Sequence, residues 1–326
     1  MLRFMILRYF KDWKNLIPLV IITCFFIVAA LAPVISPALN EKDPAYNQVV
    51  GFAKQPVPPN EEFFLGTFFG GFDVLHTLIW GTRSALLFGL SIALSTAIIG
   101  IIVGAASSLK GGTVGRLGMR ITDAFLAFPT LAGIMLFTQI LKPNTFASMA
   151  PRLTPFQQFM GSMQVEPISL ALILFSWMSY SRLTYVSIEQ QKNQEYVTAA
   201  KVMGLGSWKI FFRHILPNMI SPLTVLLTRD IGGMVILEAA FIFIGITPLE
   251  FSPFTGFVAS TIATGPEWGQ MLAASKNWII GPTLGFAYWW TFVPVTLLLI
   301  LFSVSWQLLG QRINSTINPR TYSFLK

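Results

Sequence analysis

The residues that could carry out chemistry in this sequence are few and far apart. It has two histidines, His76 and His214, and one cysteine, Cys24. It contains neither the G-x-x-x-x-G-K-[S/T] loop that binds nucleotide phosphates nor the H-E-x-x-H pattern of zinc hydrolases. No nucleophile–base pair or metal-ligand cluster converges, and both histidines fall in predicted loops. The sequence therefore predicts no catalytic residue, metal site or cofactor in this chain, and an enzyme is the least favoured class.

Four charged residues stand inside apolar runs of membrane-spanning length, where charge is costly and often functional: Asp123, Arg229, Asp230 and Glu238. They are candidates for a polar stripe that lines a pore or joins subunits, and structural contacts between helices explain them equally well. Arg229 and Asp230 are adjacent, so they should point about 100° apart and not pair. Glu238 shares a broad face with Asp230, and Asp123 should face water or Arg120.

The composition is that of an integral membrane protein. Of the 326 residues, 54% are hydrophobic and only 11% are charged, and the mean hydropathy is +0.65. A soluble domain of this size needs more charge to cover its surface. The fold class predicted is all-α integral membrane. The net charge of +8 comes without a basic cluster or RNA-binding motif, so membrane lipid is an expected partner and nucleic acid is not.

Six apolar runs are long enough to cross a bilayer as helices. The predicted spans are 17–36, 84–107, 121–141, 168–188, 219–244 and 288–309. The first run is about 20 residues, longer than the core of a signal peptide, so it is predicted to be a retained anchor. Pro129 and the pair Gly232-Gly233 are plausible bending points, and Gly100-x-x-x-Gly104 is a close-packing motif. The segment 248–282 should fold back at the outer surface, with Trp268 and Trp278 near the interface.

The distribution of basic residues sets the orientation. With the N-terminus inside, 15 Lys and Arg residues fall on the inner side and five on the outer side. The positive-inside rule then places both termini in the cytoplasm. The polar segment between the first two spans becomes a long external loop, and the loop between the fourth and fifth spans faces the cytoplasm.

That inner loop holds the segment EYVTAAKVMGLGSWKIFFRHILPN, residues 195–218. Its start predicts a short helix with one apolar stripe, formed by Tyr196, Ala199, Ala200 and Met203. Gly204 is placed for a left-handed C-cap, and Ser207 could cap a second helix. Pro217 suits a fresh start into the fifth span. Two interpretations remain open at this point: an amphipathic helix pair lying on the membrane, or a surface that docks another protein.

The pattern Glu-Tyr-Val-x-Ala-Ala-x-x-x-Gly followed by His-Ile-Leu-Pro-Asn resembles the cytoplasmic "EAA" loop of ABC importer membrane subunits, especially the peptide permeases. Further motifs of that family follow in order: Leu65-Gly66-Thr67 with Gly81-Thr82-Arg83, Glu238-Ala239, Trp268-Gly269-Gln270-Met271-Leu272, and Leu308-Leu309-Gly310 with Asn318-Pro319-Arg320. The long first external loop is similar to the C-type subunit of dipeptide, oligopeptide and nickel permeases. Phe68, Phe72, Gln311 and Asn318 replace residues that are usual in the family.

The resemblance implies a type I ABC importer-like permease fold that forms half of a translocation pore in a prokaryotic inner membrane. It implies a homologous second permease, two cytoplasmic ATPases that bind ATP and Mg²⁺, and an external solute-binding protein. Peptides are the implied substrate; nickel complexes or oligosaccharides are alternatives, and an ATP-independent secondary transporter is a less favoured one. The implied division is 1–82 for the anchor and external loop, 83–311 for the core with a coupling loop at 189–217, and 312–326 for a cytoplasmic tail. The coupling residues implied are Glu195, Tyr196, Ala199, Ala200, Met203, Gly204, Leu216 and Pro217.

Overall fold

The structure is a computed structural model that describes residues 9–10, 12–37, 49, 56–141, 155, 167–246, 250–252, 256–258, 268–276, 279 and 285–317. Within these residues the chain is almost wholly helical. The long helices are α2 (Trp13–Ile35), α3 (Val74–Lys110), α4 (Gly112–Ala127), α5 (Thr130–Leu141), α7 (Pro167–Ser176), α8 (Met178–Gln191), α11 (Leu216–Phe243) and α14 (Val293–Ile317). The short helices are α9 (Glu195–Val202), α10 (Ser207–Ile210), α12 (Trp268–Ala274), a π-helix (Phe211–Ile215) and a 3₁₀-helix (Gly285–Thr291). Two antiparallel hairpins pair β1 (Thr67–Phe68) with β2 (Phe72–Asp73), and β3 (Glu250–Ser252) with β4 (Gly256–Val258).

Three of these helices, α2, α3 and α14, are long and apolar enough to cross a membrane, and the bent pair α4 and α5 would make a fourth span. They coincide with the predicted spans at 17–36, 84–107, 288–309 and 121–141. Helices α7 and α8 are separated at Trp177 and are each shorter than 18 residues, while α11 carries three charged residues. The count of six spans therefore stays a prediction.

The span predicted at 121–141 corresponds to two helices joined at a sharp bend. Helix α4 already begins at Gly112, and the chain bends by 90° between α4 and α5. The bend falls at Phe128-Pro129, where Phe128 has an extended backbone with φ −80° and ψ 135°. Proline disfavours the helical conformation of the residue before it, so the bend predicted at Pro129 has a direct cause.

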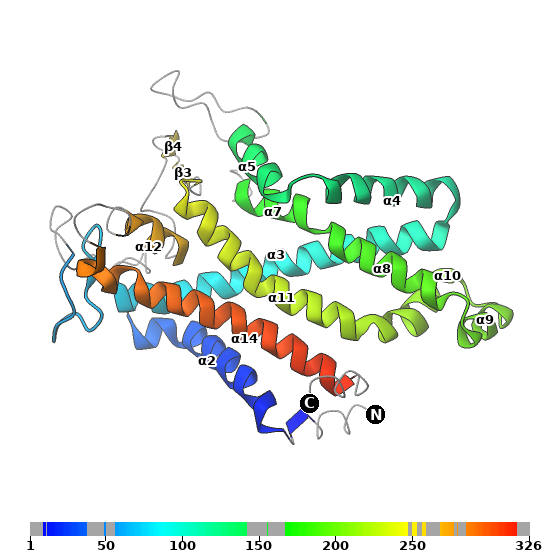
Figure 1. Cartoon of the computed structure of the whole chain (residues 1–326), viewed down its shortest axis with the longest axis horizontal. Helices are drawn as coiled ribbons and strands as arrows, with labels where there is room; N and C mark the ends of the chain where they lie inside the picture. Colours follow the sequence, from blue (N-terminus) through cyan, green and yellow to red (C-terminus); the bar gives the residue numbers. More distant parts are fainter. Residues whose placement is uncertain are drawn as a thin grey trace.

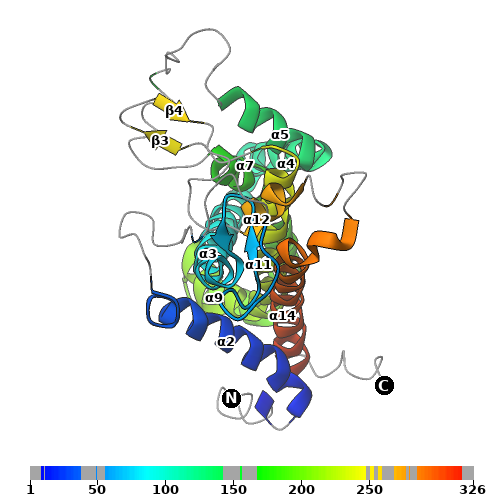
Figure 2. The same cartoon turned by 90° about the vertical axis from the view of Figure 1, so that its left-hand side faces the viewer.

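Helices α3 and α11 lie in the middle of the molecule, with α2 and α14 on one side and α4 and α5 on the other (Figure 2). Helix α9 lies at one end of the long axis, and α12 lies at the opposite end (Figure 1). The largest apolar core joins α2, α3, α11, α12 and α14. Trp268 belongs to this core with only 2% of its surface exposed, so it packs against other helices, and its predicted position near the membrane interface stays a prediction; Trp278 lies outside the described residues.

Helices α3 and α8 lie in very close contact. A Cβ atom on Gly100 would lie 2.3 Å from the Trp177 carbonyl oxygen, and one on Gly104 would lie 2.3 Å from that of Ser181. Only glycine allows two helix backbones to approach this closely. The packing role predicted for Gly100-x-x-x-Gly104 is confirmed.

Neither histidine lies in a loop, contrary to the sequence prediction. His76 is in the first turn of α3 and is 2% exposed, and its Nδ1 lies 2.6 Å from the Ser36 hydroxyl at the end of α2. The Trp80 indole donates a second bond to the Ser36 carbonyl at 3.0 Å. These contacts fasten the end of α2 to the start of α3. His214 lies in the π-helix that leads into α11.

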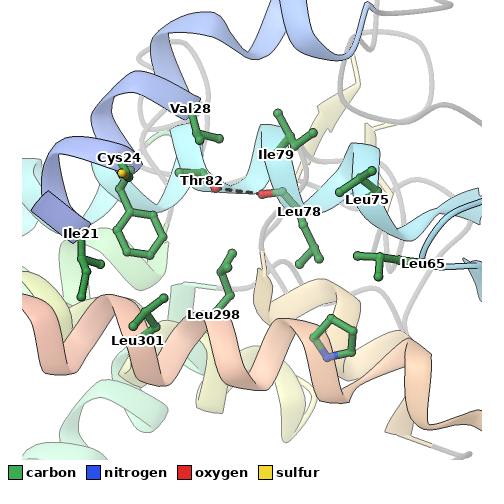
Figure 3. A pocket seen from close by; sticks show the side chains of 12 residues that line it. Ile21, Cys24, Val28, Leu65, Leu75, Leu78, Ile79, Thr82, Leu298 and Leu301 are labelled. Carbon is green, nitrogen blue, oxygen red and sulfur yellow. Dashed lines mark hydrogen bonds between the residues drawn. The ribbon is translucent and has the colours of Figure 1, made fainter.

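An apolar groove of about 380 Å³ opens between α2, α3 and α14 (Figure 3). Cys24 and Phe25 line it from α2, Leu78 from α3, and Leu298 from α14. The one hydroxyl in the lining, that of Thr82, donates to the Leu78 carbonyl of its own helix at 2.9 Å. Helix α2 is therefore packed less completely against its neighbours than α8 is against α3.

Candidate coupling helix and intramembrane charges

Helix α9 spans Glu195–Val202, as the sequence predicted to within one residue. Glu195 lies in its first turn and Lys201 in its last turn, where each charge complements the helix dipole. The Thr198 hydroxyl donates to the Gln194 carbonyl at 3.2 Å. A helix of eight residues is too short to be stable alone, so its contacts with the rest of the chain must hold it.

The end of α9 is a Schellman motif. Gly204 adopts the left-handed conformation with φ +80°. Its N–H donates to the Lys201 carbonyl at 2.9 Å, and the Leu205 N–H donates to the Ala200 carbonyl at 3.1 Å. A Cβ on Gly204 would meet nothing within 4 Å, so glycine is needed here for its backbone and not for space. The predicted C-cap is confirmed.

The inner face of α9 is narrow. Val197 and Ala200 are 1% and 0% exposed, and they pack into an apolar cluster that includes Ala105 of α3 and Ile188 of α8. Of the four residues predicted to form one apolar stripe, only Ala200 is buried. The prediction missed Val197, although the i, i+3 spacing of Val197 and Ala200 was a usable signal.

Polar bonds complete the attachment of α9. The Tyr196 hydroxyl donates to Gln191 Oε1 at 2.7 Å and accepts a 3.3 Å bond from the Asn218 amide. The Lys201 ammonium reaches the Lys192 carbonyl at 3.4 Å. Because Gln191 ends α8 and Asn218 lies in the first turn of α11, α9 is tied to both long helices.

The outer face of α9 and the turn after it expose apolar side chains. Val202 is 84% exposed and Met203 is 70% exposed. The Trp208 and Phe212 rings stack at 6.0 Å and are 41% and 60% exposed. We call this set the docking surface: Tyr196, Ala199, Val202, Met203, Trp208 and Phe212. Exposed apolar patches of this kind mark contacts with proteins or membranes.

The chain after α9 differs from the predicted second helix. Gly206, not Ser207, is the N-cap residue of α10, and no side chain caps it. The α10 helix passes through the π-helix into α11 without an intervening loop. Pro217 is the second residue of α11 and follows the π-helix without a break, so the fresh start that the sequence predicted there is not observed; Leu216 packs partly against the cluster below α9.

The four intramembrane candidates do not form one site. Asp123 pairs with Arg182 of α8 at 3.0 Å, and not with Arg120. Arg229 and Asp230 do pair, at 3.2 Å, so the prediction that they could not was wrong. The helix directs their Cα–Cβ bonds apart, but the long arginine stem bends back across the gap. Glu238 is 5% exposed and lies nine residues after Arg229, on the opposite face of α11.

Among the described residues, no group of three or more His, Cys, Asp and Glu side chains could hold a metal ion.

A comparison with solved structures shows the fold. The chain is similar to a structure titled "Inward facing conformations of the MetNI methionine ABC transporter: CY5 native crystal form", with a TM-score of 0.51 and 16% identity. The match covers 75% of this chain and 97% of that one. The chain therefore shares the fold of that chain.

The chain belongs to the family described as "Binding-protein-dependent transport system inner membrane component", whose profile matches residues 96–318. It is an inner-membrane transport subunit and not an enzyme. It is 28% identical to the "Dipeptide transport system permease protein DppC" of Haemophilus influenzae, over 96% of this chain and 92% of the relative. It is 30% identical to the "Di/tripeptide transport system permease protein DppC" of Pseudomonas aeruginosa, over 79% and 72%. It is 24% identical to the "Oligopeptide transport system permease protein OppC" of Bacillus subtilis, over 96% and 88%.

Proposed function

We propose that this permease subunit imports di- or oligopeptides and forms one half of their translocation pore. The support is the agreement of its relatives, which carry the names of dipeptide, di/tripeptide and oligopeptide permeases. The proposed assembly contains a homologous second permease, two ATPases that bind ATP and Mg²⁺ in the cytoplasm, and an external solute-binding protein.

The proposed topology has six spans with both termini in the cytoplasm. The first residues of α2 and the last residues of α14 both lie on the side of these helices that is nearer to α9 (Figure 1). Both chain ends are therefore on the side proposed to face the cytoplasm, which supports this orientation. The proposed division keeps an anchor with its external loop at 1–82, a core at 83–311 and a tail at 312–326. Helices α3 and α14 run across both boundaries, so the three parts are structurally continuous.

We propose that α9 is the coupling helix, and one observation carries this proposal. Its inner face, Val197 and Ala200, is fixed to α3 and α8, while its outer face leaves Val202 and Met203 bare. An apolar surface on a rigid mount can seat in a groove of another protein and transmit movement. Movement of the ATPases would reach the membrane through α8 and α11, the two helices that α9 joins. In this arrangement Glu195, Tyr196, Ala199, Met203 and Gly204 contact or shape the interface, and Ala200, Leu216 and Pro217 support it.

Of the intramembrane candidates, we assign Arg229 and Asp230 to the transport pathway. Arg229 has 57% of its side chain exposed in the middle of α11. We assign Asp123 and Glu238 to contacts between helices, because Asp123 pairs with Arg182 and Glu238 is buried.

The test is gentle affinity purification of the full chain from its native membrane, followed by peptide uptake in vesicles that contain the recovered complex. The proposal expects a second permease, ATPases with phosphate-binding loops, and ATP-dependent uptake of peptides. A stable chain that is recovered with no ATPase would contradict the coupling function. Uptake of nickel complexes or oligosaccharides instead of peptides would contradict only the substrate.

A further inference from the structure

The exposed side of α11 forms a continuous line along the helix. Pro222, Arg229, Ile236 and Ala240 are all exposed, and at 100° per residue they lie within about 20° of one line. The only charge on this line is Arg229, which stands at its middle. A guanidinium in the middle of a span is not stable against lipid, so this line faces either a water-filled path or another subunit.

Arg229 is held in place by Asp230, but not all of its N–H donors are used. Its Nε and Nη2 atoms both bond to a single oxygen, Asp230 Oδ1, at 3.3 and 3.2 Å. The carboxylate is the more sheltered partner, with 12% of its side chain exposed against 57% for the arginine. The five N–H donors of arginine form a flat fork, so the Nη1 edge still presents donors outward.

The surface next to Arg229 on α11 is open at Gly233. Gly233 follows Arg229 by one turn of α11, and a Cβ placed on it would meet nothing within 4 Å. Its neighbour Gly232 differs, because a Cβ there would lie 2.7 Å from the Ser303 Cα atom of α14. Helix packing therefore accounts for Gly232, whereas Gly233 leaves the approach to Arg229 open.

We propose that Arg229, oriented by Asp230, is a binding residue in the pathway that contacts carboxylate groups of the passing substrate. Every peptide carries one such group at its C-terminus, and acidic peptides carry another. The guanidinium favours anionic peptides over cationic ones during translocation, because it forms charge-assisted bonds to carboxylates and repels ammonium groups. This inference rests on the proposed function of peptide import.

The test compares three dipeptides of similar size: alanyl-glutamate, alanyl-glutamine and alanyl-lysine. Maximal uptake rates are measured in vesicles with the complete transporter and saturating binding protein, which keeps the selectivity of that protein constant. In Arg229→Gln the uptake of alanyl-glutamate relative to alanyl-lysine should fall about tenfold. Arg229→Lys should keep most of the wild-type ratio. Arg116→Gln is the matched control, since Arg116 bonds only to a carbonyl of its own helix, that of Gly112 at 3.3 Å.

Two outcomes overturn the inference. An assembled Arg229→Gln transporter with the wild-type uptake ratio would show that Arg229 does not contact the substrate. Loss of the second permease from purified Arg229→Gln, restored in Arg229→Lys, would assign the residue to the subunit interface. If the wild-type transporter imports none of the three dipeptides, the dipeptide import on which this inference rests fails instead, and that result is distinct from both.

Discussion

Helix α8 takes part in two contacts of opposite character. Along its length it lies against Gly100 and Gly104 of α3 so closely that no Cβ fits between them. Just beyond its end, α9 rests on two small or medium side chains, Val197 and Ala200, and turns apolar groups outward. The first contact leaves no room for independent movement of α3 and α8. The second presents a surface that is stable enough to persist and open enough to bind.

If α9 has the proposed coupling function, this difference determines how force would pass from α9 to the long helices. A partner that pushed on the docking surface would move α9, which is tied to the end of α8 by Tyr196 and Lys201. Because α8 is packed tightly against α3, we expect the two helices to move together. Well-packed elements shift between discrete arrangements and do not deform gradually. Substitutions at α9 and at the α3–α8 contact should therefore have different effects.

The largest effect is expected from a charge on the inner face of α9. Ala200→Asp places a carboxylate where no surface is exposed, and should lower the free energy of unfolding by about 3 kcal/mol and detach α9. Val202→Asp places the same charge on a side chain that is 84% exposed, so the melting temperature should not change. Less ATPase subunit should copurify with either variant, Ala200→Asp or Val202→Asp, than with the wild type. Full ATPase recovery with Ala200→Asp would show that the inner face is not needed.

The next effect concerns the α3–α8 contact. Gly104→Ala adds a Cβ that would lie 2.3 Å from the Ser181 carbonyl oxygen, so the helices must separate, at a cost of about 2 kcal/mol. Gly233→Ala is the control, because its Cβ meets nothing within 4 Å and alanine favours the helix. Thermal unfolding in detergent should place Gly104→Ala below the wild type and Gly233→Ala at or above it. Equal melting temperatures for the two variants would disprove the tight contact.

A smaller effect is expected at the C-cap of α9. Gly204→Ala forces a Cβ residue into a left-handed conformation with φ +80°, which costs about 1 kcal/mol. Gly204→Asn should be milder, since asparagine tolerates this conformation. Neither adds a steric clash. Stimulation of ATPase activity by the binding protein should be highest for the wild type, lower for Gly204→Asn and lowest for Gly204→Ala. Higher stimulation for Gly204→Ala than for Gly204→Asn would argue against the importance of the left-handed C-cap.

The smallest effect concerns Glu189, which joins α8 to α3. Partial burial acts to raise its pKa, but bonds from Lys192 and from the Ser108 hydroxyl, 2.7 Å away, outweigh it and hold the pKa of Glu189 below its ordinary value of 4.5. A lowered folded-state pKa gives stability above pH 4.5 that is lost as the pH falls through that lower value. At neutral pH the free energy of unfolding of the wild type should exceed that of Glu189→Gln by about 0.5 kcal/mol. The gap should close in acid, and a gap that widened there would contradict this assignment.

Local signals in the sequence predicted the parts that depend on neighbouring residues. The extent of α9, the left-handed Gly204, the bend at Pro129 and the Gly100–Gly104 contact all follow from short patterns, and the structure confirms them. Each depends on backbone rules that act within a few residues.

The sequence could not predict features that depend on tertiary packing. The buried face of α9 is set by where α3 and α8 lie, so the apolar spacing selected Tyr196 and Met203 where the structure buries Val197. The burial of Trp268 depends on the helices around it, because α2, α11 and α14 enclose its side chain and no pattern near residue 268 indicates this. The Arg229–Asp230 pair depends on the arginine rotamer, which angular spacing along a helix does not determine.

The most direct test of the coupling assignment is site-specific photo-crosslinking in the native membrane. A photoreactive amino acid replaces Met203, and in a matched chain it replaces Val114 of α4, which is similarly apolar and 61% exposed. Illumination of transporting cells should link position 203, and not position 114, to a cytoplasmic ATPase subunit. An active transporter that gives no ATPase adduct at position 203 would show that α9 does not receive the force.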